Sequence, residues 1–302
     1  MNEIILTSNE VKGVNFEDCE ESFVKYLDVS DKTLRAYKVG VECFLNYLRE
    51  KKIKEPTRND IISFRDYLRK NYSSNTVNSY MIAVRSLFKY LEIHKLYENI
   101  TINIKGARYD NTPKKEVLTS DVMKEIYNNL TDKREKAVFG LMVTTGLRAF
   151  EVADALIEDI KTYNGEVVLF FLGKMRDSKD EYVKLSPQVL NDIKEYIGDR
   201  KSGHIFVSHS NHNKNGGMTT TSLRRIVKNI FKRFGIEKDT ISCHSLRRSF
   251  AVASYESGSS IYDIQQVLHH KSIQTTTRYL KQVDRDKNKT EYNVSNMILG
   301  GI

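Results

Sequence analysis

Helical periodicity in the first 100 residues is the feature that most constrains the fold of this 302-residue chain. Apolar side chains recur at i, i+3 or i+4 and i+7 in three stretches, residues 33–48, 61–68 and 77–91, and this spacing lines one face of a helix. Each stretch follows a serine or threonine of the kind that caps a helix N-terminus. With a further helix over residues 16–27, the pattern predicts a compact four-helix unit.

The helical pattern fails between residues 101 and 117. Glycine, asparagine, proline and lysine accumulate there, as they do in linkers between folded units. We therefore predict an N-terminal domain over residues 1–105, a linker over residues 106–117 and a C-terminal domain over residues 118–302.

The C-terminal part mixes helices with strands. Two runs rich in β-branched and aromatic residues, 166–172 and 181–185, flank a polar turn and predict a β-hairpin. The expected fold class is two-domain: an all-α four-helix domain, then a mixed α/β, mainly helical domain with a small antiparallel sheet. The helices predicted in this second domain cover residues 120–130, 137–144, 187–197, 223–234, 243–257 and 261–268.

Composition narrows the class of protein. No apolar run approaches the ~20 residues that a bilayer-spanning helix needs, and the first residues lack the basic and apolar order of a secretory signal. The three cysteines are odd in number and far apart, which indicates neither a disulfide framework nor a metal-binding pair. We expect a cytoplasmic protein with no membrane association.

Positive charge is concentrated in one stretch of the chain. The sequence carries 48 basic and 39 acidic residues, a net charge of +9, and residues 161–250 alone hold 17 basic and 9 acidic ones, a net +8. A local excess of this kind is typical of a surface that binds phosphates. Charge alone leaves open the alternative of a basic protein with no nucleic-acid partner.

Three short segments of the C-terminal part bring arginine, histidine and glutamate to helical spacing. Arg148 and Glu151 follow a glycine turn, and His244 and Arg247 lie three residues apart. A pair of histidines ends the last predicted helix, nine residues before Tyr279. Taken singly, each motif has an ordinary explanation, such as a surface ion pair or a solvated helix edge. Their order along the chain is the informative feature.

The Gly-Leu-Arg-x-x-Glu, His-x-Leu-Arg and Leu-x-His plus Tyr arrangement resembles the tyrosine recombinase (phage integrase) family and its small Xer-like members. The resemblance covers nearly the whole chain, because the four-helix unit and the linker match the family's core-binding domain and connector. It implies a site-specific recombinase that cleaves and rejoins duplex DNA through a 3′-phosphotyrosyl intermediate. The early start of the core-binding domain favours a simple Xer-like or transposon-borne enzyme over an integrase with an extra arm-binding domain.

The resemblance also implies a role for each motif residue. Two guanidinium groups can meet the non-bridging oxygens of a reacting phosphate with forked hydrogen bonds. They supply the charge stabilisation that a metal ion supplies elsewhere, so no metal or cofactor is expected. The implied roles are the clamp for Arg148 and Arg247, the nucleophile for Tyr279, the general base or a phosphate contact for His244, a phosphate hydrogen bond for His270, and orientation of His244 or Arg148 for Glu151.

Two of these assignments leave an alternative open. The family's lysine general acid lies in the turn of the hairpin, where Lys174 is expected and Lys179 is the rival, because Gly-Lys-Met replaces the usual Gly-Lys-Gly. His269 stands where the family normally has a glycine before its histidine. Spacing to Tyr279 favours His270 over His269 as the phosphate contact.

Other polar groups have plainer explanations. His204, His209 and His212 share no helical face and are expected to be solvated rather than to bind a metal. Cys243 diverges from the adjacent histidine by about 100° on a helix, which favours a core cysteine over a nucleophile. One predicted helix carries a basic series, which is either a solvated face or, as the resemblance implies, a contact to the DNA backbone: Arg224, Arg225, Lys228, Lys232 and Arg233.

The expected partners are double-stranded DNA and further copies of the chain, as a homo-tetramer in the synaptic complex. The need for a second recombinase or an activating protein stays open. The alternative functions are a type IB topoisomerase-like enzyme and a catalytically silent DNA-binding protein on the same fold. The last apolar segment, residues 294–299, is too short for a stable isolated helix, and the resemblance implies docking on a neighbouring protomer. Packing on its own domain is the alternative.

Overall fold

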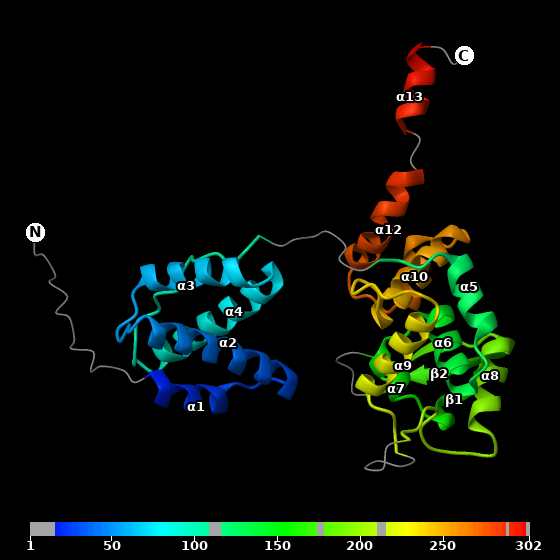
Figure 1. Cartoon of the computed structure of the whole chain (residues 1–302), viewed down its shortest axis with the longest axis horizontal. Coiled ribbons are helices and arrows are strands. Elements are labelled where there is room, and N and C mark those ends of the chain that lie inside the picture. The colour runs from blue at the N-terminus through cyan, green and yellow to red at the C-terminus, as the bar shows by residue number, and fades with distance from the viewer. Residues whose placement is uncertain (1–15, 109–115, 174–177, 210–215, 288–289, 300–302) are drawn as a thin grey trace, which may run out of the picture. The chain divides into compact units, whose positions relative to one another are not determined.

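The computed structural model describes residues 16–108, 116–173, 178–209, 216–287 and 290–299, without the side chains of residues 17, 18 and 281–287 (Figure 1). The chain forms two compact units, Met1–Thr112 and Pro113–Ile302, and each is described by itself. Within the described ranges, every helix is too short or too polar to span a bilayer.

The described part of the first unit consists of the four predicted helices, α1 (Phe16–Tyr26), α2 (Asp31–Glu50), α3 (Arg58–Asn71) and α4 (Ser74–Ile93). Side-chain oxygens cap the N-termini of α2, α3 and α4. Ser30 accepts a hydrogen bond from the N–H of Thr33 ahead of α2, and Thr57 forms a capping box with Asp60 ahead of α3. Ser73 caps α4, one residue before the predicted start. These oxygens satisfy N–H groups that have no partner within the helix.

Aromatic rings fill the core of the first unit. Phe44, Phe64 and Phe88 are fully buried, and the centroid of Phe44 lies 5.0 Å from that of Phe64 and 5.9 Å from that of Phe88, in edge-on contacts. Such contacts add to the free energy of apolar burial. α2 and α4 approach closely at Gly40, where a Cβ atom would lie 2.8 Å from that of Ala83. The four helices therefore share one core.

The second unit contains, among its described residues, a three-stranded antiparallel sheet in the order β1 (Ile160–Tyr163), β2 (Glu166–Phe171) and β3 (Glu181–Lys184). β2 and β3 form the predicted hairpin, with Leu169 opposite Val183, and both of these side chains enter the core. β1 is absent from the sequence prediction. It has four residues, of which one is half-buried and three are exposed, so it shows no apolar alternation.

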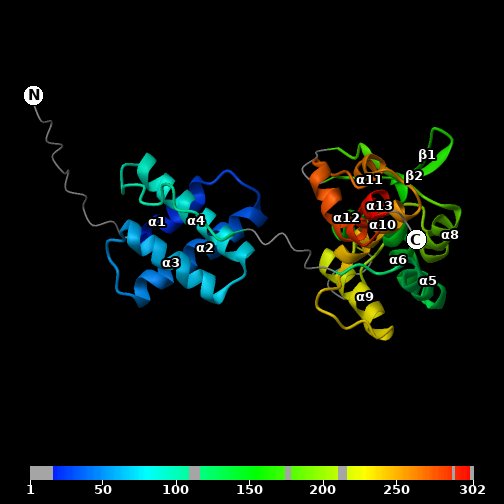
Figure 2. The ribbon, with the colours of Figure 1, turned by 90° about the horizontal axis from the view of Figure 1, so that it is seen from above.

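Helices pack around α6 (Lys133–Thr145), which contacts α5, α7, α8, α9 and α10 and lies among them (Figure 2). The predicted fold class, a four-helix domain followed by a mainly helical domain with a small antiparallel sheet, is confirmed. The remaining helices of the unit are α5 (Ser120–Asn129), α7 (Ala149–Ala153), α8 (Pro187–Ile197), α9 (Thr220–Arg233), α10 (Cys243–Glu256), α11 (Ile261–Val267), α12 (Ile273–Lys287) and α13 (Thr290–Leu299).

α12 and α13 are helices that the sequence prediction lacks. α12 packs on α10 and α11 and carries Tyr279 into a small apolar cluster with Leu268 and Leu280. α13 includes the apolar segment 294–299, and none of its residues is buried. Met297, for example, is 80% exposed. The first of these helices is held by packing, and the second presents an apolar surface.

Candidate active site

Four segments of the second unit converge on Tyr279, whose side chain is 9% exposed. They are the turn between α6 and α7, the first turns of α10, the turn between α11 and α12, and α12 itself. Each carries a residue of the predicted site: Arg148, then His244 with Arg247, then His270, then Tyr279. The fold thus brings together motifs that lie more than 100 residues apart in the sequence.

Arg247 joins these segments at their centre. Its side chain is 2% exposed; Nη1 donates to the carbonyl of Gly146 at 2.7 Å, and Nη2 donates to the carbonyl of Leu268. Burial, followed by the charge of Arg148, lowers the pKa of Arg247 to about 10. Its Nε is buried and has no hydrogen-bond partner among the described residues. An unpaired buried donor of a guanidinium is suited to an anionic ligand.

Gly146 makes the turn that presents Arg148. Its φ of 66° is left-handed, and a Cβ atom there would lie 2.6 Å from the ring of Phe250, so the position needs glycine. Arg148 follows as the N-cap of α7 rather than as part of a helical face, which corrects the sequence interpretation. Glu151 accepts from the Arg148 backbone N–H at 2.6 Å and from its Nη1 at 2.7 Å. Of its two predicted partners, Glu151 therefore contacts Arg148.

Tyr279 and His244 are in direct contact. A hydrogen bond of 3.0 Å joins Tyr279 Oη and His244 Nε2, and the two rings meet edge-on with centroids 5.8 Å apart. His244 itself is exposed, because it lies on the outer side of the first turn of α10. A phenol and an imidazole at this distance can exchange a proton.

His270 lies on another side of the tyrosine ring, with centroids 5.5 Å apart. A hydrogen bond of 2.9 Å between His270 Nδ1 and Thr276 Oγ1 fixes the imidazole. Burial, followed by the charges of Arg247 and Arg148, lowers the pKa of His270 to about 3. The ring is therefore neutral near pH 7 and can donate one hydrogen bond without adding a charge to the site.

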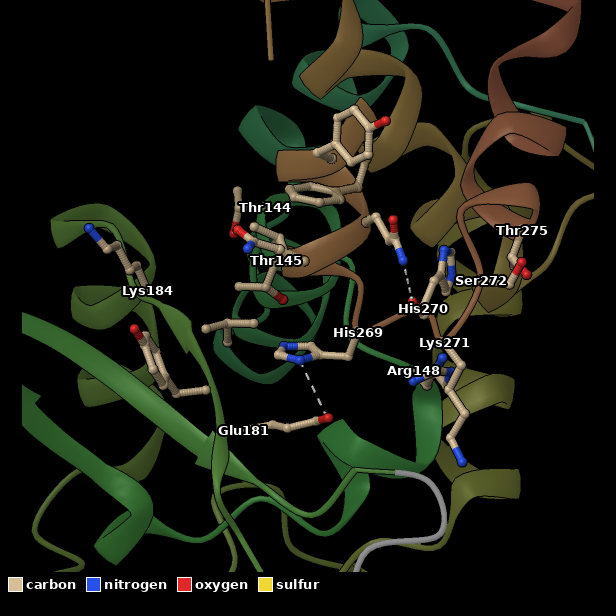
Figure 3. Close-up of a pocket in the computed structure, with 17 residues that line it drawn as sticks. Thr144, Thr145, Arg148, Glu181, Lys184, His269, His270, Lys271, Ser272 and Thr275 are labelled. Carbon is tan, nitrogen blue, oxygen red and sulfur yellow. Dashed lines mark hydrogen bonds and ion pairs between the residues drawn. The ribbon is translucent and has the colours of Figure 1, made fainter. Parts of the chain in front are cut away.

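His269 points away from the tyrosine. Its φ of 49° is left-handed, at the position after a helix end that favours glycine, and the N–H groups of His269 and His270 close the turn on the carbonyls of Gln266 and Gln265. Its Nδ1 lies 3.5 Å from Glu181 Oε2 on β3 (Figure 3), and its ring packs edge-on against Phe171. His270 is thus the histidine that contacts Tyr279.

A cavity of about 1330 Å³ adjoins the site on the side of Arg148 and His270, whereas Tyr279, His244 and Arg247 are not among its lining residues. Arg148 and His270 line it together with Lys271, Ser272 and Thr275 (Figure 3). Two guanidinium groups, from Arg148 and Arg247, and the carboxylate of Glu151 leave a net positive charge beside this cavity. An anionic group such as a phosphodiester is complementary to that charge.

Of the two candidate lysines in the hairpin turn, Lys174 lies outside the described residues. Lys179 is described, and its Nζ lies 2.6 Å from Asp159 Oδ2 and 3.5 Å from the carbonyl of Asp154. Asp159 is held in turn by the N–H of Leu156. Lys179 therefore forms an ion pair with Asp159 on the turn before β1.

The other predicted residues lie apart from this cluster. The basic series on α9 (Arg224, Arg225, Lys228, Lys232 and Arg233) is exposed throughout, and Arg233 forms an ion pair with Glu135. Cys243 is buried, and burial raises the pKa of its thiol to about 11. His209 is exposed, and His212 lies outside the described residues. Where the chain is described, no group of three or more His, Cys, Asp or Glu side chains is arranged to hold a metal ion.

Two residues of the site carry no role in the sequence analysis. Thr276 holds His270, and Arg248 lies over the ring of Tyr279, 5.5 Å from its centroid. Arg248 is part of the His-x-Leu-Arg-Arg segment, so its position in the sequence is a signal. The sequence gives no signal that Arg248 is buried, because adjacent residues on a helix usually face different environments.

Comparison with known proteins agrees with this arrangement. The phage integrase family model matches residues 116–285, and the model of the phage integrase N-terminal SAM-like domain matches residues 21–95. A tyrosine recombinase of Thermosipho africanus is 31% identical over an alignment of 268 residues. The match covers 85% of this chain and 91% of the relative. The tyrosine recombinase XerD of Listeria innocua is 28% identical over 87% of this chain and 93% of its own length.

Solved structures show the same fold. The XerH site-specific recombinase bound to a palindromic difH substrate has a TM-score of 0.70 at 22% identity, covering 93% of this chain and 84% of that one. A lambda integrase dimer bound to a core site has a TM-score of 0.73 at 16% identity, covering 93% and 80%. The chain therefore belongs to the phage integrase family. It is a site-specific tyrosine recombinase, an enzyme that cleaves DNA and transfers the strand.

Proposed function

We propose that Tyr279 is the nucleophile of this recombinase and attacks a phosphodiester of double-stranded DNA. The observation that carries the proposal is the 3.0 Å contact between Tyr279 Oη and His244 Nε2, inside a cluster of guanidinium groups. In the proposed step the phenol proton passes to His244, a bond forms between Oη and phosphorus, and the bond from phosphorus to the 5′ oxygen breaks. The product is a 3′-phosphotyrosyl link that retains the energy of the broken bond for rejoining.

Arg148 and Arg247 carry the charge that develops on the non-bridging oxygens. Arg247 is fixed by two backbone carbonyls and Arg148 by Glu151, so neither group has to reorganise when the phosphate arrives. Donors that are already oriented stabilise a transition state more than mobile ones do. His270, neutral and held by Thr276, supplies a further hydrogen bond to the phosphate.

The leaving 5′ oxygen needs a proton, and we assign this role to Lys174. Support comes from Lys179, the rival in the same turn, which is engaged by Asp159. Transfer of a proton from Lys179 would first require that ion pair to break. Lys174→Ala is expected to slow cleavage far more than Lys179→Ala. A substrate whose bridging 5′ oxygen is replaced by sulfur should restore the Lys174 variant, since a thiolate leaves without protonation.

The experiment that tests the nucleophile is covalent trapping on a nicked DNA substrate. Tyr279→Phe removes one oxygen from a buried ring, so we expect DNA binding to persist and the covalent adduct to vanish. Tyr163→Phe, at an exposed position on β1, is the matched control and should form the adduct normally. Peptide mapping of the wild-type adduct should identify Tyr279. A modified peptide that contains another tyrosine would overturn the assignment.

We propose double-stranded DNA as the partner of α9, a homo-tetramer as the active assembly, and the cytoplasm, in association with the nucleoid, as the place of the reaction. Related structures include XerH bound to its difH substrate and a lambda integrase tetramer bound to a Holliday junction. We also propose that residues 1–105 are the core-binding domain, residues 106–117 the linker and residues 118–302 the catalytic domain; the family models that match residues 21–95 and 116–285 support this division. Strand exchange between two labelled sites separates this function from that of a type IB topoisomerase, and adduct formation separates it from that of a silent DNA-binding protein. The same assay with purified protein alone tests whether a second recombinase or an activating protein is needed.

A further inference from the structure

Arg248 is a buried cation that pairs with no carboxylate among the described side chains. Its side chain is 6% exposed, its Nε is buried with no hydrogen-bond partner, and no ion pair to it is found among the described side chains. Its guanidinium carbon lies over the ring of Tyr279, 5.5 Å from the centroid. A buried charge destabilises a protein unless something compensates it. The described group that can do so is the tyrosine ring.

The interaction between Arg248 and Tyr279 depends on the charge of the tyrosine. A neutral phenol attracts a cation through the electron-rich face of its ring. A phenolate attracts the cation more strongly, because its negative charge spreads into the ring and Coulomb attraction adds to the cation–π attraction. In keeping with this, burial lowers the pKa of Arg248, whereas its Coulomb interaction with Tyr279 acts to raise it.

We propose that Arg248 is a positioning residue for the nucleophile: it holds the Tyr279 ring by its face and stabilises the negative charge that develops there as the hydroxyl proton leaves. The inference rests on the proposed function of Tyr279. Arg248 neither gives nor takes a proton, so the balance of the cleavage step is unchanged.

The other groups around Tyr279 meet it in other ways. His244 makes a hydrogen bond to the oxygen, and His270 meets the ring edge-on and is held by Thr276. Arg247 donates to the carbonyls of Gly146 and Leu268 and also interacts with Tyr279 through its charge and a side-chain hydrogen bond. Arg148 is paired with Glu151. Arg248 differs from both arginines because it lies over the face of the ring.

The test is single-turnover cleavage of a nicked DNA substrate at saturating protein, from pH 6 to pH 9. We expect Arg248→Gln to cleave about tenfold or more slowly than wild type near pH 7, with a defect that shrinks as the pH rises. Arg248→Lys, which keeps the charge, should recover part of the rate. Arg248→Met fills the buried site without charge, and it serves in place of the Gln variant if that variant does not fold.

A second measurement separates charge stabilisation from a structural role. Incorporation of a fluorinated tyrosine at position 279 makes the phenol intrinsically more acidic. It should therefore restore the neutral Arg248 variants more than it accelerates wild type. A defect that is equal at every pH and unchanged by fluorination would overturn the inference, as would wild-type cleavage by both neutral variants.

DNA binding must be measured beside cleavage. Half-site affinity and its dependence on salt should be the same in Arg248→Gln and wild type, because Arg248 acts on the tyrosine. A weaker affinity with a shallower salt dependence would mean that Arg248 contacts a phosphate, and the inference would be wrong. Failure of the proposed function would look different, since Tyr279→Phe would then still form the covalent adduct.

Discussion

The guanidinium of Arg247 has a geometric task that a lysine cannot perform. It donates to two carbonyls on different segments, whereas an ammonium is a point charge on a flexible stem. We expect Arg247→Lys and Arg148→Lys each to slow cleavage by ~10²-fold or more, measured in single turnover at saturating DNA. Lys194→Arg, an exposed exchange on α8 that also keeps the charge, is the control and should stay near wild type. Wild-type rates in both site variants would exclude the clamp.

His270 makes the stability of the fold depend on pH. Its pKa is about 3 in the folded protein against an ordinary 6.5. Between these values the unfolded chain binds a proton that the folded chain does not, so the free energy of unfolding falls as the pH decreases from 6.5 towards 3. Urea denaturation at pH 7.5, 6.5 and 5.5 measures the slope. His270→Gln should flatten it, and an unchanged slope in that variant would contradict the prediction.

His269 tests backbone strain apart from side-chain contacts. Both His269→Gly and His269→Ala remove the contacts to Glu181 and Phe171, but glycine alone adopts a φ of 49° without strain. We expect the glycine variant to be more stable than the alanine variant by about 1 kcal/mol, as measured by chemical denaturation. Equal stabilities would show that the turn relaxes when the imidazole is absent.

At the scale of elements, caps and apolar stripes predicted the helices well, because both signals are local in sequence. β1 was not predicted because its extended conformation is stabilised by pairing with β2, where Ile160 lies opposite Leu169. α12 was not predicted because its helical face is defined by packing on α10 and α11. The motif residues of the site could be found from their order along the chain. The burial of Arg248 over Tyr279 could not, since it depends on where α12 lies.

The exposed apolar surface of α13 has a testable use. We expect it to dock on a neighbouring protomer, because an apolar helix with no buried residue gains stability from a second surface. Deletion of residues 291–302 should weaken tetramer assembly on DNA and disturb the coordination of cleavage. Binding to a single half-site should be largely unchanged.

A full-length variant with Met297, Ile298 and Leu299 changed to serine is the control for chain length and should behave like the deletion. Native gels of half-site and synaptic complexes measure both effects. Normal synapsis and recombination by the truncated protein would exclude the docking of α13 on a neighbouring protomer.

For the whole molecule, the net charge of +9 predicts a strong effect of salt on DNA affinity. A protein that covers many phosphates releases many counterions, so affinity should fall by about 10³-fold or more between 50 and 200 mM salt. Neutralising Lys228 on α9 should reduce the slope of log affinity against log salt by about 1. Lys194→Gln, exposed on α8, is the matched control. A flat dependence would mean that α9 does not face DNA.

The acceptors that hold Arg247 are main-chain oxygens, and this decides which genetic changes the site tolerates. Every amino acid carries a carbonyl, so replacement of Leu268 by another apolar residue leaves the acceptor in place. Insertion or deletion of a single residue between Gly146 and Arg148, or between Leu268 and His270, would instead move an acceptor relative to the side chain of Arg148 or His270. At Leu268 the site therefore tolerates an exchange between apolar side chains better than a change in the length of the turn.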